Sequence, residues 1–271
     1  MRFLFWNTHN TKDINSILCG MIVEQKANIV ILAEYEDIIE DLIYNLDLKG
    51  VRMNVYPSIG CDRLIILGNT KDIRQSRQSK YYSMQIIKND MLLCGVHLPS
   101  QMWADERTQT LAFQSVVRDI ELAEEDGGID KTIVVGDFNQ NPYDDGCLGA
   151  CGFHGIPIAD EAQKISRTIF GTTYKMFYNP MWNLLGDFSY PPGTYYYRGS
   201  KEKNEFWNIF DQVIVRPQLR SRFVDKELKI ITKAQGVSLV AQNQQPNEKI
   251  SDHLPIVFQL TEDQVWTVCY R

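Results

Sequence analysis

The strongest constraint on the fold is a series of short apolar runs that end in polar residues. Two of these runs, 29–33 and 132–136, are rich in β-branched residues and carry no charge over five positions. Runs of this kind are typical of strands buried on both faces of a sheet. Each is far too short to cross a bilayer. The runs therefore predict a sheet that is covered by other layers on both sides.

Helical periodicity separates several of these runs. Apolar residues spaced three and four apart predict helices over 11–25, 38–46 and 105–124. We expect further strands at 2–6, 51–56, 64–67, 81–87, 91–97, 209–215, 228–232 and 254–260. The irregular alternation, with pairs that look antiparallel, predicts an α/β protein of mixed type, with two packed mixed sheets and helices outside. We expect one domain over 1–271, with an aromatic-rich insertion at about 160–206.

Charge and cysteine content narrow the possible functions. The 28 basic and 34 acidic residues give a net charge of −6, which argues against a protein that binds duplex DNA mainly through phosphate contacts. A local basic patch remains compatible with this total. The six cysteines follow no disulfide framework and no secretory signal is recognisable, so we expect a cytoplasmic protein with reduced thiols. No membrane association and no obligate protein partner are expected.

Polar side chains with ligand or acid–base chemistry stand at the ends of the expected strands. In a two-sheet sandwich, strand ends at one edge converge on a single cleft. Taken alone, each of these residues has an ordinary structural explanation, so only the set is informative. Carboxylate and amide oxygens suit Mg²⁺, and histidines suit proton transfer. The set comprises Asn7, Glu34, His97, Asp137, Asn139, Asp211, Asp252 and His253.

The order and local sequence of these residues resemble the endonuclease/exonuclease/phosphatase superfamily. The most specific elements are Gly136-Asp137-Phe138-Asn139 and Ser251-Asp252-His253-Leu254-Pro255. The supporting elements are Trp6-Asn7, Ala33-Glu34, Val96-His97-Leu98 and Phe210-Asp211-Gln212-Val213-Ile214-Val215. The resemblance spans residues 1 to about 260 and implies the deoxyribonuclease-I-like four-layer sandwich with metal-dependent cleavage of phosphoester bonds.

The resemblance also implies a metal site. Glu34 resembles the principal Mg²⁺ ligand of the family, with Asn7 beside it. Asp252 is expected to contribute to the metal shell directly or through water. Mn²⁺ is expected to substitute for Mg²⁺. The metal would neutralise charge that develops on the phosphorus centre and on the leaving group.

Catalytic roles follow from the same resemblance. His253 resembles the proton-transfer residue, and Asp211 resembles the carboxylate that orients its imidazole and favours the charged form. Asp137 is expected to position or deprotonate the attacking water. Asn139 is expected to hold a phosphate oxygen, and His97 to bind phosphate or protonate the leaving oxygen.

Three positions depart from the family pattern or lack a counterpart in it. His9 replaces an acid that some members carry, so it is a candidate substrate contact or a sign that the metal shell differs. Arg63 precedes a strand where many members have small residues. It is a candidate phosphate contact, with a surface ion pair as the alternative. Arg107, early in the helix expected at 105–124, has the same two interpretations.

Aromatic residues crowd the segment 174–207, where Arg198, Lys201 and Lys203 add positive charge. Aromatic side chains beside a phosphodiesterase cleft can stack on nucleic-acid bases. The alternative is that they pack a small core beneath a long loop. We take Tyr195 and Trp207 as the candidate substrate contacts from this segment.

These features predict a Mg²⁺-dependent phosphodiester hydrolase, with a nuclease acting on DNA or RNA as the first hypothesis. The alternative is a phosphatase or phosphodiesterase that acts on a small nucleotide or sugar phosphate. A binding protein without catalysis on the same fold is a third hypothesis, disfavoured because the expected site residues are all present. Fold alone does not decide among substrates.

Overall fold

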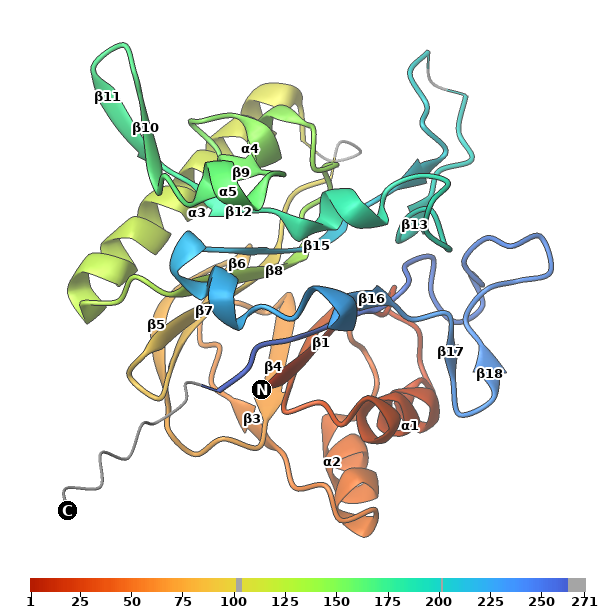
Figure 1. Ribbon diagram of the computed structural model, residues 1–271. Coiled ribbons are helices and arrows are strands. Elements are labelled where there is room, and N and C mark those ends of the chain that lie inside the picture. Colours follow the sequence, from red (N-terminus) through yellow and green to blue (C-terminus); the bar gives the residue numbers. More distant parts are fainter. Residues whose placement is uncertain (101–103, 201, 263–271) are drawn as a thin grey trace, which may run out of the picture.

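Two large sheets form the centre of the computed structural model, which describes residues 1–100, 104–200 and 202–262 (Figure 1). The first sheet consists of β1 (Arg2–Asn7), β2 (Ile29–Ala33), β3 (Asn54–Tyr56), β4 (Leu64–Gly68), β16 (Lys229–Ile230) and β19 (Ile256–Gln259). The second consists of β5 (Ile73–Ser79), β6 (Tyr82–Ile87), β7 (Met91–His97), β8 (Thr132–Asp137), β9 (Gly155–Ile156), β12 (Phe177–Tyr178) and β15 (Asp211–Val215). Their strand orders are β16-β19-β1-β2-β4-β3 and β5-β6-β7-β8-β15-β12-β9.

Helices cover the outer faces of the two sheets, and short hairpins project from the ends (Figure 1). The helices are α1 (Asn15–Gln25), α2 (Ile39–Leu48), α3 (Glu106–Gly127), α4 (Asp145–Leu148) and α5 (Ala159–Ala162), with 3₁₀ turns η1 (Pro180–Leu184), η2 (Pro217–Arg222) and η3 (Asp225–Glu227). The hairpins pair β10 (Ser166–Ile169) with β11 (Thr172–Lys175), β13 (Tyr195–Tyr196) with β14 (Trp207–Asn208), and β17 (Lys233–Ala234) with β18 (Val237–Ser238). The expected mixed α/β fold with two packed mixed sheets is confirmed.

The alternation of side chains along the central strands explains the four layers. In β1, Phe3 and Phe5 pack between the two sheets, whereas Leu4 and Trp6 pack in the outer core that includes residues of α1 and α2. Successive side chains of a strand point to opposite faces, so a strand that is apolar throughout must be covered on both. In β8, Val134 likewise joins the outer core beneath α3. The apolar runs therefore specify a sandwich with helices outside.

Strand register brings the polar strand ends to one edge of the sandwich. Asn7 at the end of β1 lies beside Ala33 at the end of the parallel strand β2. In the second sheet, His97 at the end of β7 pairs with Asp137 at the end of the parallel strand β8. Asp211 begins β15, which runs antiparallel to β8, so Asp211 also lies opposite Asp137. The first residues of one strand and the last residues of its neighbours thus meet at one place.

Gly136 allows β7 and β8 to approach closely just before this edge. Its φ is +156°, and a Cβ atom placed there would lie 1.9 Å from the carbonyl oxygen of Val96. Such an approach is available only to glycine. The glycine of the Gly136-Asp137-Phe138-Asn139 element therefore has a packing reason that also fixes Asp137 beside His97.

A buried ion pair between Glu124 and Arg216 connects α3 to the second sheet. Arg216 follows β15, and its Nε and Nη2 atoms donate to the carboxylate of Glu124 in α3 at 2.7 and 3.3 Å. Thr132 and Lys175 donate to the same carboxylate at 2.7 and 3.0 Å. Glu124 and Arg216 are 4% and 3% exposed, so their charges depend on each other for compensation.

Several expected boundaries shift for local reasons. The helix expected at 11–25 begins only at Asn15, because Asn10 and Asp13 adopt positive φ angles of 52° and 59°. The strand expected at 51–56 is limited to Asn54–Tyr56. The strand β5 was not expected because its sequence, IRQSRQS, is mostly polar. In the described part of the chain, no helix combines the length and apolar character needed to cross a membrane.

Candidate active site

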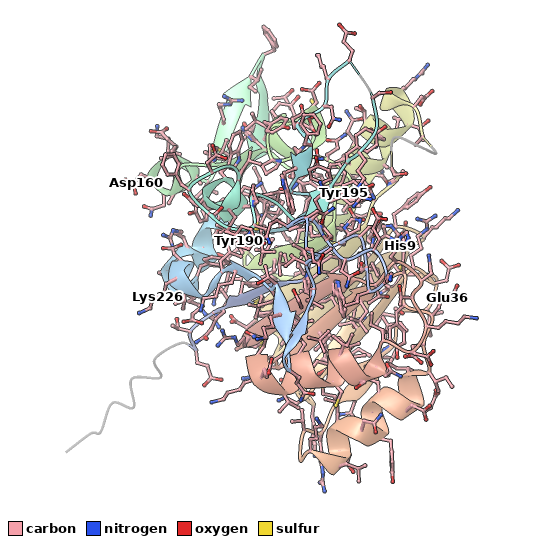
Figure 2. All side chains as sticks on the ribbon, turned by 90° about the vertical axis from the view of Figure 1, so that its right-hand side faces the viewer. His9, Glu36, Asp160, Tyr190, Tyr195 and Lys226 are labelled. Atoms are coloured by element: carbon pink, nitrogen blue, oxygen red, sulfur yellow. The ribbon has the colours of Figure 1, made fainter. Side chains whose placement is uncertain are left out.

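The converging strand ends open into a cleft of about 930 Å³. Figure 2 faces this side of the molecule and labels His9 and Tyr195, both of which line the cleft. Most of the residues selected from the sequence lie along its wall. They are His9, Glu34, Arg63, His97, Asp137, Asn139, Tyr195, Asp252 and His253.

Asp137 lies at the centre of the site. Its Oδ1 accepts a 2.8 Å hydrogen bond from the backbone N–H of Asn139, and its Oδ2 accepts a 3.0 Å bond from Nδ2 of Asn7. The Nε2 atoms of His97 and His253 lie 3.9 and 4.0 Å from Oδ2. The carboxylate is therefore held in place by two donors while two imidazoles face it from neighbouring elements.

Glu34 follows β2 and is presented to the cleft by a left-handed backbone. Its φ is +49°, a conformation that costs energy in a residue other than glycine and that concentrates at functional sites. Asn10 donates to Oε2 at 3.0 Å, and Nε2 of His97 lies 3.3 Å from Oε1. Hydrogen bonding to His97 outweighs burial and lowers the pKa of Glu34 to about 2. Glu34 is thus ionised over the physiological range.

Asp211 and His253 form a buried pair. Nδ1 of His253 lies 3.0 and 2.9 Å from the two carboxylate oxygens of Asp211, which is 0% exposed. Burial alone would lower the pKa of His253. The negative charges of Asp211 and Asp137 more than reverse this effect and raise the pKa to about 10. The pair therefore presents a protonated Nε2 to Asp137 at neutral pH.

Hydrogen bonds tie the loop that carries Asp252 and His253 to the end of β1. Ser251 Oγ donates to the carbonyl of Asn7 at 2.8 Å and accepts from the N–H of His253 at 3.0 Å. The indole N–H of Trp6 donates to the carbonyl of His253 at 3.0 Å. Trp6 and Ser251 therefore have a structural role beside Asn7 and His253, because their hydrogen bonds hold the loop against the end of β1.

Tyr195 packs directly on the catalytic candidate His253. The ring centroids are 4.8 Å apart, and the tyrosine also stacks on Phe210 at 5.2 Å. Burial, reinforced by Asp252 and Asp137, raises the pKa of Tyr195 to about 12, so its phenol stays protonated. Tyr195 therefore combines a packing contact with a place in the cleft wall.

Four selected residues do not line the cleft. Asn7 and Asp211 lie behind it and act through their hydrogen bonds to Asp137 and His253. Arg107 is exposed in the first turn of α3 and is not among the residues of the cleft wall. Trp207 packs against the outer core beneath the first sheet and lies edge-on to Tyr196, with centroids 5.4 Å apart.

Other residues contribute to the site without having been selected from the sequence. Thr194 is fully buried, and its Oγ1 accepts from the N–H of Asp211 at 3.2 Å. Asn141 lines the cleft and donates to Asn208 at 2.8 Å. Asn141 stands two positions after Asn139, so its proximity to the Gly136-Asp137-Phe138-Asn139 element could have identified it. The contact of Thr194 with Asp211 carries no local sequence signal.

The donor set fits a hard divalent cation. Glu34 and Asp252 bring carboxylate oxygens to the cleft. The amide oxygen of Asn7 lies next to this wall and accepts from the N–H of His9, itself a cleft residue, at 3.0 Å. A second group consists of Asp137, Asp211 and His253, whose ligand atoms all lie within 4.8 Å of one another. In this second group Asp211 and His253 already satisfy each other, which leaves Asp137 as the available oxygen ligand.

Comparison with solved structures identifies the fold. The chain is similar to an AP endonuclease from Archaeoglobus fulgidus at 13% sequence identity and a TM-score of 0.58, covering 97% of this chain and 100% of that one. It is equally similar to a 3'-5' exonuclease from Neisseria meningitidis, with the same identity, TM-score and coverage. Its similarity to D. rerio TDP2 complexed with a single-strand DNA product has a TM-score of 0.56 at 15% identity, covering 97% and 99%.

The sequence matches no family profile and no curated protein. The structural matches nevertheless cover nearly the whole chain from end to end. The chain therefore has the deoxyribonuclease-I-like fold of these structures.

Proposed function

We propose that the protein is a Mg²⁺-dependent phosphodiester hydrolase that acts on DNA or RNA. The observation that carries this proposal is that one cleft brings Glu34, His97 and His253 together around Asp137, with Asp211 holding His253 from behind. An ionised carboxylate, a protonated imidazole and a second carboxylate within reach of it are the groups that hydrolysis of a phosphodiester requires.

Glu34, Asn7 and Asp252 are the residues that would hold the metal ion. The pKa of Glu34, lowered to about 2, keeps this ligand ionised, and oxygen donors match the preference of Mg²⁺, or of Mn²⁺ in its place. When bound, the ion supplies charge neutralisation at the phosphate and at the leaving oxygen.

Asp137 and His253 divide the proton transfers between them. In this proposal Asp137, held by Asn7 and by the Asn139 backbone, orients the attacking water and accepts its proton. His253, whose pKa is raised to about 10, donates a proton to an oxygen of the phosphate or of the leaving group. Asp211 fixes the tautomer of His253 by occupying Nδ1, so Nε2 is the atom that acts.

His97 and Asn139 complete the phosphate-binding surface in this proposal. His97 is 5% exposed at the end of β7 and directs Nε2 toward Glu34 and Asp137. Asn139 donates one hydrogen to the carbonyl of Leu98 at 2.9 Å, which leaves the second hydrogen of its amide for a phosphate oxygen.

The size and the lining of the cleft favour a nucleic-acid substrate over a small phosphoester. A volume of about 930 Å³ exceeds what a sugar phosphate requires, and aromatic rings of Tyr81, Tyr195 and Tyr197 border it. Two of the similar structures are of proteins described as an endonuclease and an exonuclease, and a third contains a DNA product.

A substrate panel tests the proposal. The protein is incubated with Mg²⁺ and single-stranded DNA, single-stranded RNA, duplex DNA, nucleotides and sugar phosphates, each with and without excess chelator. We expect chelator-sensitive hydrolysis with the highest kcat/KM on a nucleic acid. Hydrolysis confined to nucleotides or sugar phosphates would favour the small-phosphoester alternative, and turnover that persists in chelator would refute the metal-dependent reaction.

A further inference from the structure

One wall of the cleft carries the positive charge of Arg63. Arg63 lines the cleft immediately before β4, and its guanidinium lies 5.3 Å from the centre of the Tyr81 ring. Lys80 lies over the same ring at 5.8 Å. Within the described residues, we find no ion pair or hydrogen bond that occupies the Arg63 side chain. An arginine that is held over an aromatic ring and lacks a carboxylate is suited to bind a phosphate.

Strand register places this arginine beside the reacting centre. Leu64, which follows Arg63, pairs with Ala33, which precedes Glu34. The backbone carbonyl of Tyr81 accepts from the N–H of His97 at 2.9 Å. Arg63 and Tyr81 therefore continue the row that Glu34 and His97 begin, on the side away from β15.

The opposite wall carries mainly negative charge. The loop after β8 contributes Asp144, and the loop before β14 contributes Glu202, Lys203 and Glu205. Burial, with a further contribution from Glu205, raises the pKa of Asp144 despite a hydrogen bond from the Asn141 backbone. A continuing phosphate backbone on this side would meet carboxylates, whereas the donor and acceptor groups of an uncharged nucleoside would find hydrogen-bonding partners.

From this charge layout we propose that the cleft takes the end of a single nucleic-acid strand, with the terminal nucleoside on the Asp144–Glu205 wall and the rest of the strand leaving past Arg63. The proposal rests on the hydrolase function above and adds the substrate form: cleavage releases terminal nucleotides and spares internal positions. The water oxygen bonds to phosphorus and loses a proton to Asp137. The bond between phosphorus and the oxygen of the remaining strand breaks as that oxygen takes a proton from His253, so the terminal nucleoside leaves with the phosphate. Arg63 binds the next phosphate of the strand.

Linear and circular single-stranded DNA of the same sequence test this directly. With Mg²⁺, the wild-type protein should shorten the linear strand to mononucleotides and leave the circle intact over the same time. Hydrolysis of bis(4-nitrophenyl) phosphate, a diester with no flanking phosphate, is measured in the same preparations. Equal cleavage of circle and line would overturn the end-specific proposal while leaving the hydrolase function standing. No hydrolysis of any of the three substrates would overturn both.

The variant Arg63→Gln tests the role of the arginine, with Arg52→Gln as the matched control because Arg52 is 91% exposed and lies outside the cleft. Arg63→Gln should lower kcat/KM on the linear strand about tenfold more than on the small diester, since a charge-assisted contact to a phosphate is lost. The slope of log kcat/KM against log salt should fall in magnitude by about 0.7, as expected for one phosphate contact to a single strand. Arg52→Gln should change neither quantity. Parallel losses on both substrates, or an unchanged salt slope, would refute the assignment of Arg63.

Discussion

Replacing Asp211 by asparagine isolates the contribution of its negative charge to His253. The side chain keeps its size, so the buried position stays filled. The carboxylate that lies 2.9 and 3.0 Å from Nδ1 becomes a neutral amide. Burial alone lowers the pKa of an imidazole, so His253 in Asp211→Asn should lose its proton well below the wild-type pKa of about 10.

The size of the effect follows from the interaction that is lost. A hydrogen bond to a charged group contributes about 1.5–3 kcal/mol, which corresponds to roughly 10- to 150-fold in kcat. Removing the imidazole itself in His253→Ala removes the proton donor, an effect of about 10²–10⁴-fold. Because Asp211 acts through His253, the double variant should be little worse than His253→Ala alone.

The assay is kcat on bis(4-nitrophenyl) phosphate at saturating Mg²⁺ from about pH 5 to pH 10, a range that spans the ordinary histidine pKa and the raised value. In the wild type the loss of activity with rising pH should come only near pH 10, whereas in Asp211→Asn it should begin at a lower pH. Asp47→Asn, which removes a surface carboxylate that is 61% exposed, is the control for net charge. Fully additive losses in the double variant, or an unshifted alkaline limb, would show that Asp211 has a separate role.

Three further predictions concern a buried ion pair and two aromatic side chains. Arg216→Met should destabilise the fold by about 3 kcal/mol in urea unfolding, because it leaves the buried Glu124 with only partial compensation; a loss below about 1 kcal/mol would show that the pair is dispensable. Trp207→Ala should lower stability by about 2 kcal/mol without changing kcat/KM per folded molecule, because the ring packs on the outer core. Tyr195→Leu should lower kcat on the small diester as well, because this ring contacts His253; a loss confined to nucleic acid would show instead that it only stacks on bases.

The central strands and the convergence of the site could be predicted because they depend on local patterns. Continuous apolar runs such as Ile29–Ala33 admit few structures other than strands buried on both faces. Once the strands are placed, residues at their ends must meet at the edges of the sheets. This reasoning is sufficient to bring Glu34, His97 and Asp137 together.

Features that depend on contacts between distant residues could not be predicted from the sequence pattern. The strand β5 is mostly polar because it forms an edge of the second sheet, where half-buried side chains reach solvent and no alternation is imposed. Aromatic content did not distinguish Tyr195, which faces the cleft, from Trp207, which packs against the core. The register of the hairpin β13–β14 explains the difference, because Trp207 pairs with Tyr196 and Tyr195 pairs with Asn208. Neighbouring residues of a strand point to opposite faces, so Tyr195 and Trp207 lie on opposite faces of the hairpin.

The most direct test of the account is whether Glu34 is required for metal-dependent hydrolysis. Glu34→Gln keeps the shape of the side chain and removes its charge, and Glu36→Gln makes the same change at an exposed position outside the cleft. Hydrolysis of bis(4-nitrophenyl) phosphate and the melting temperature are measured for both variants over a range of Mg²⁺ concentrations. We predict that Glu34→Gln stays folded at the assay temperature and loses at least about 100-fold in kcat/KM, whereas Glu36→Gln behaves as the wild type. Wild-type activity and an unaltered Mg²⁺ dependence in Glu34→Gln would contradict the account.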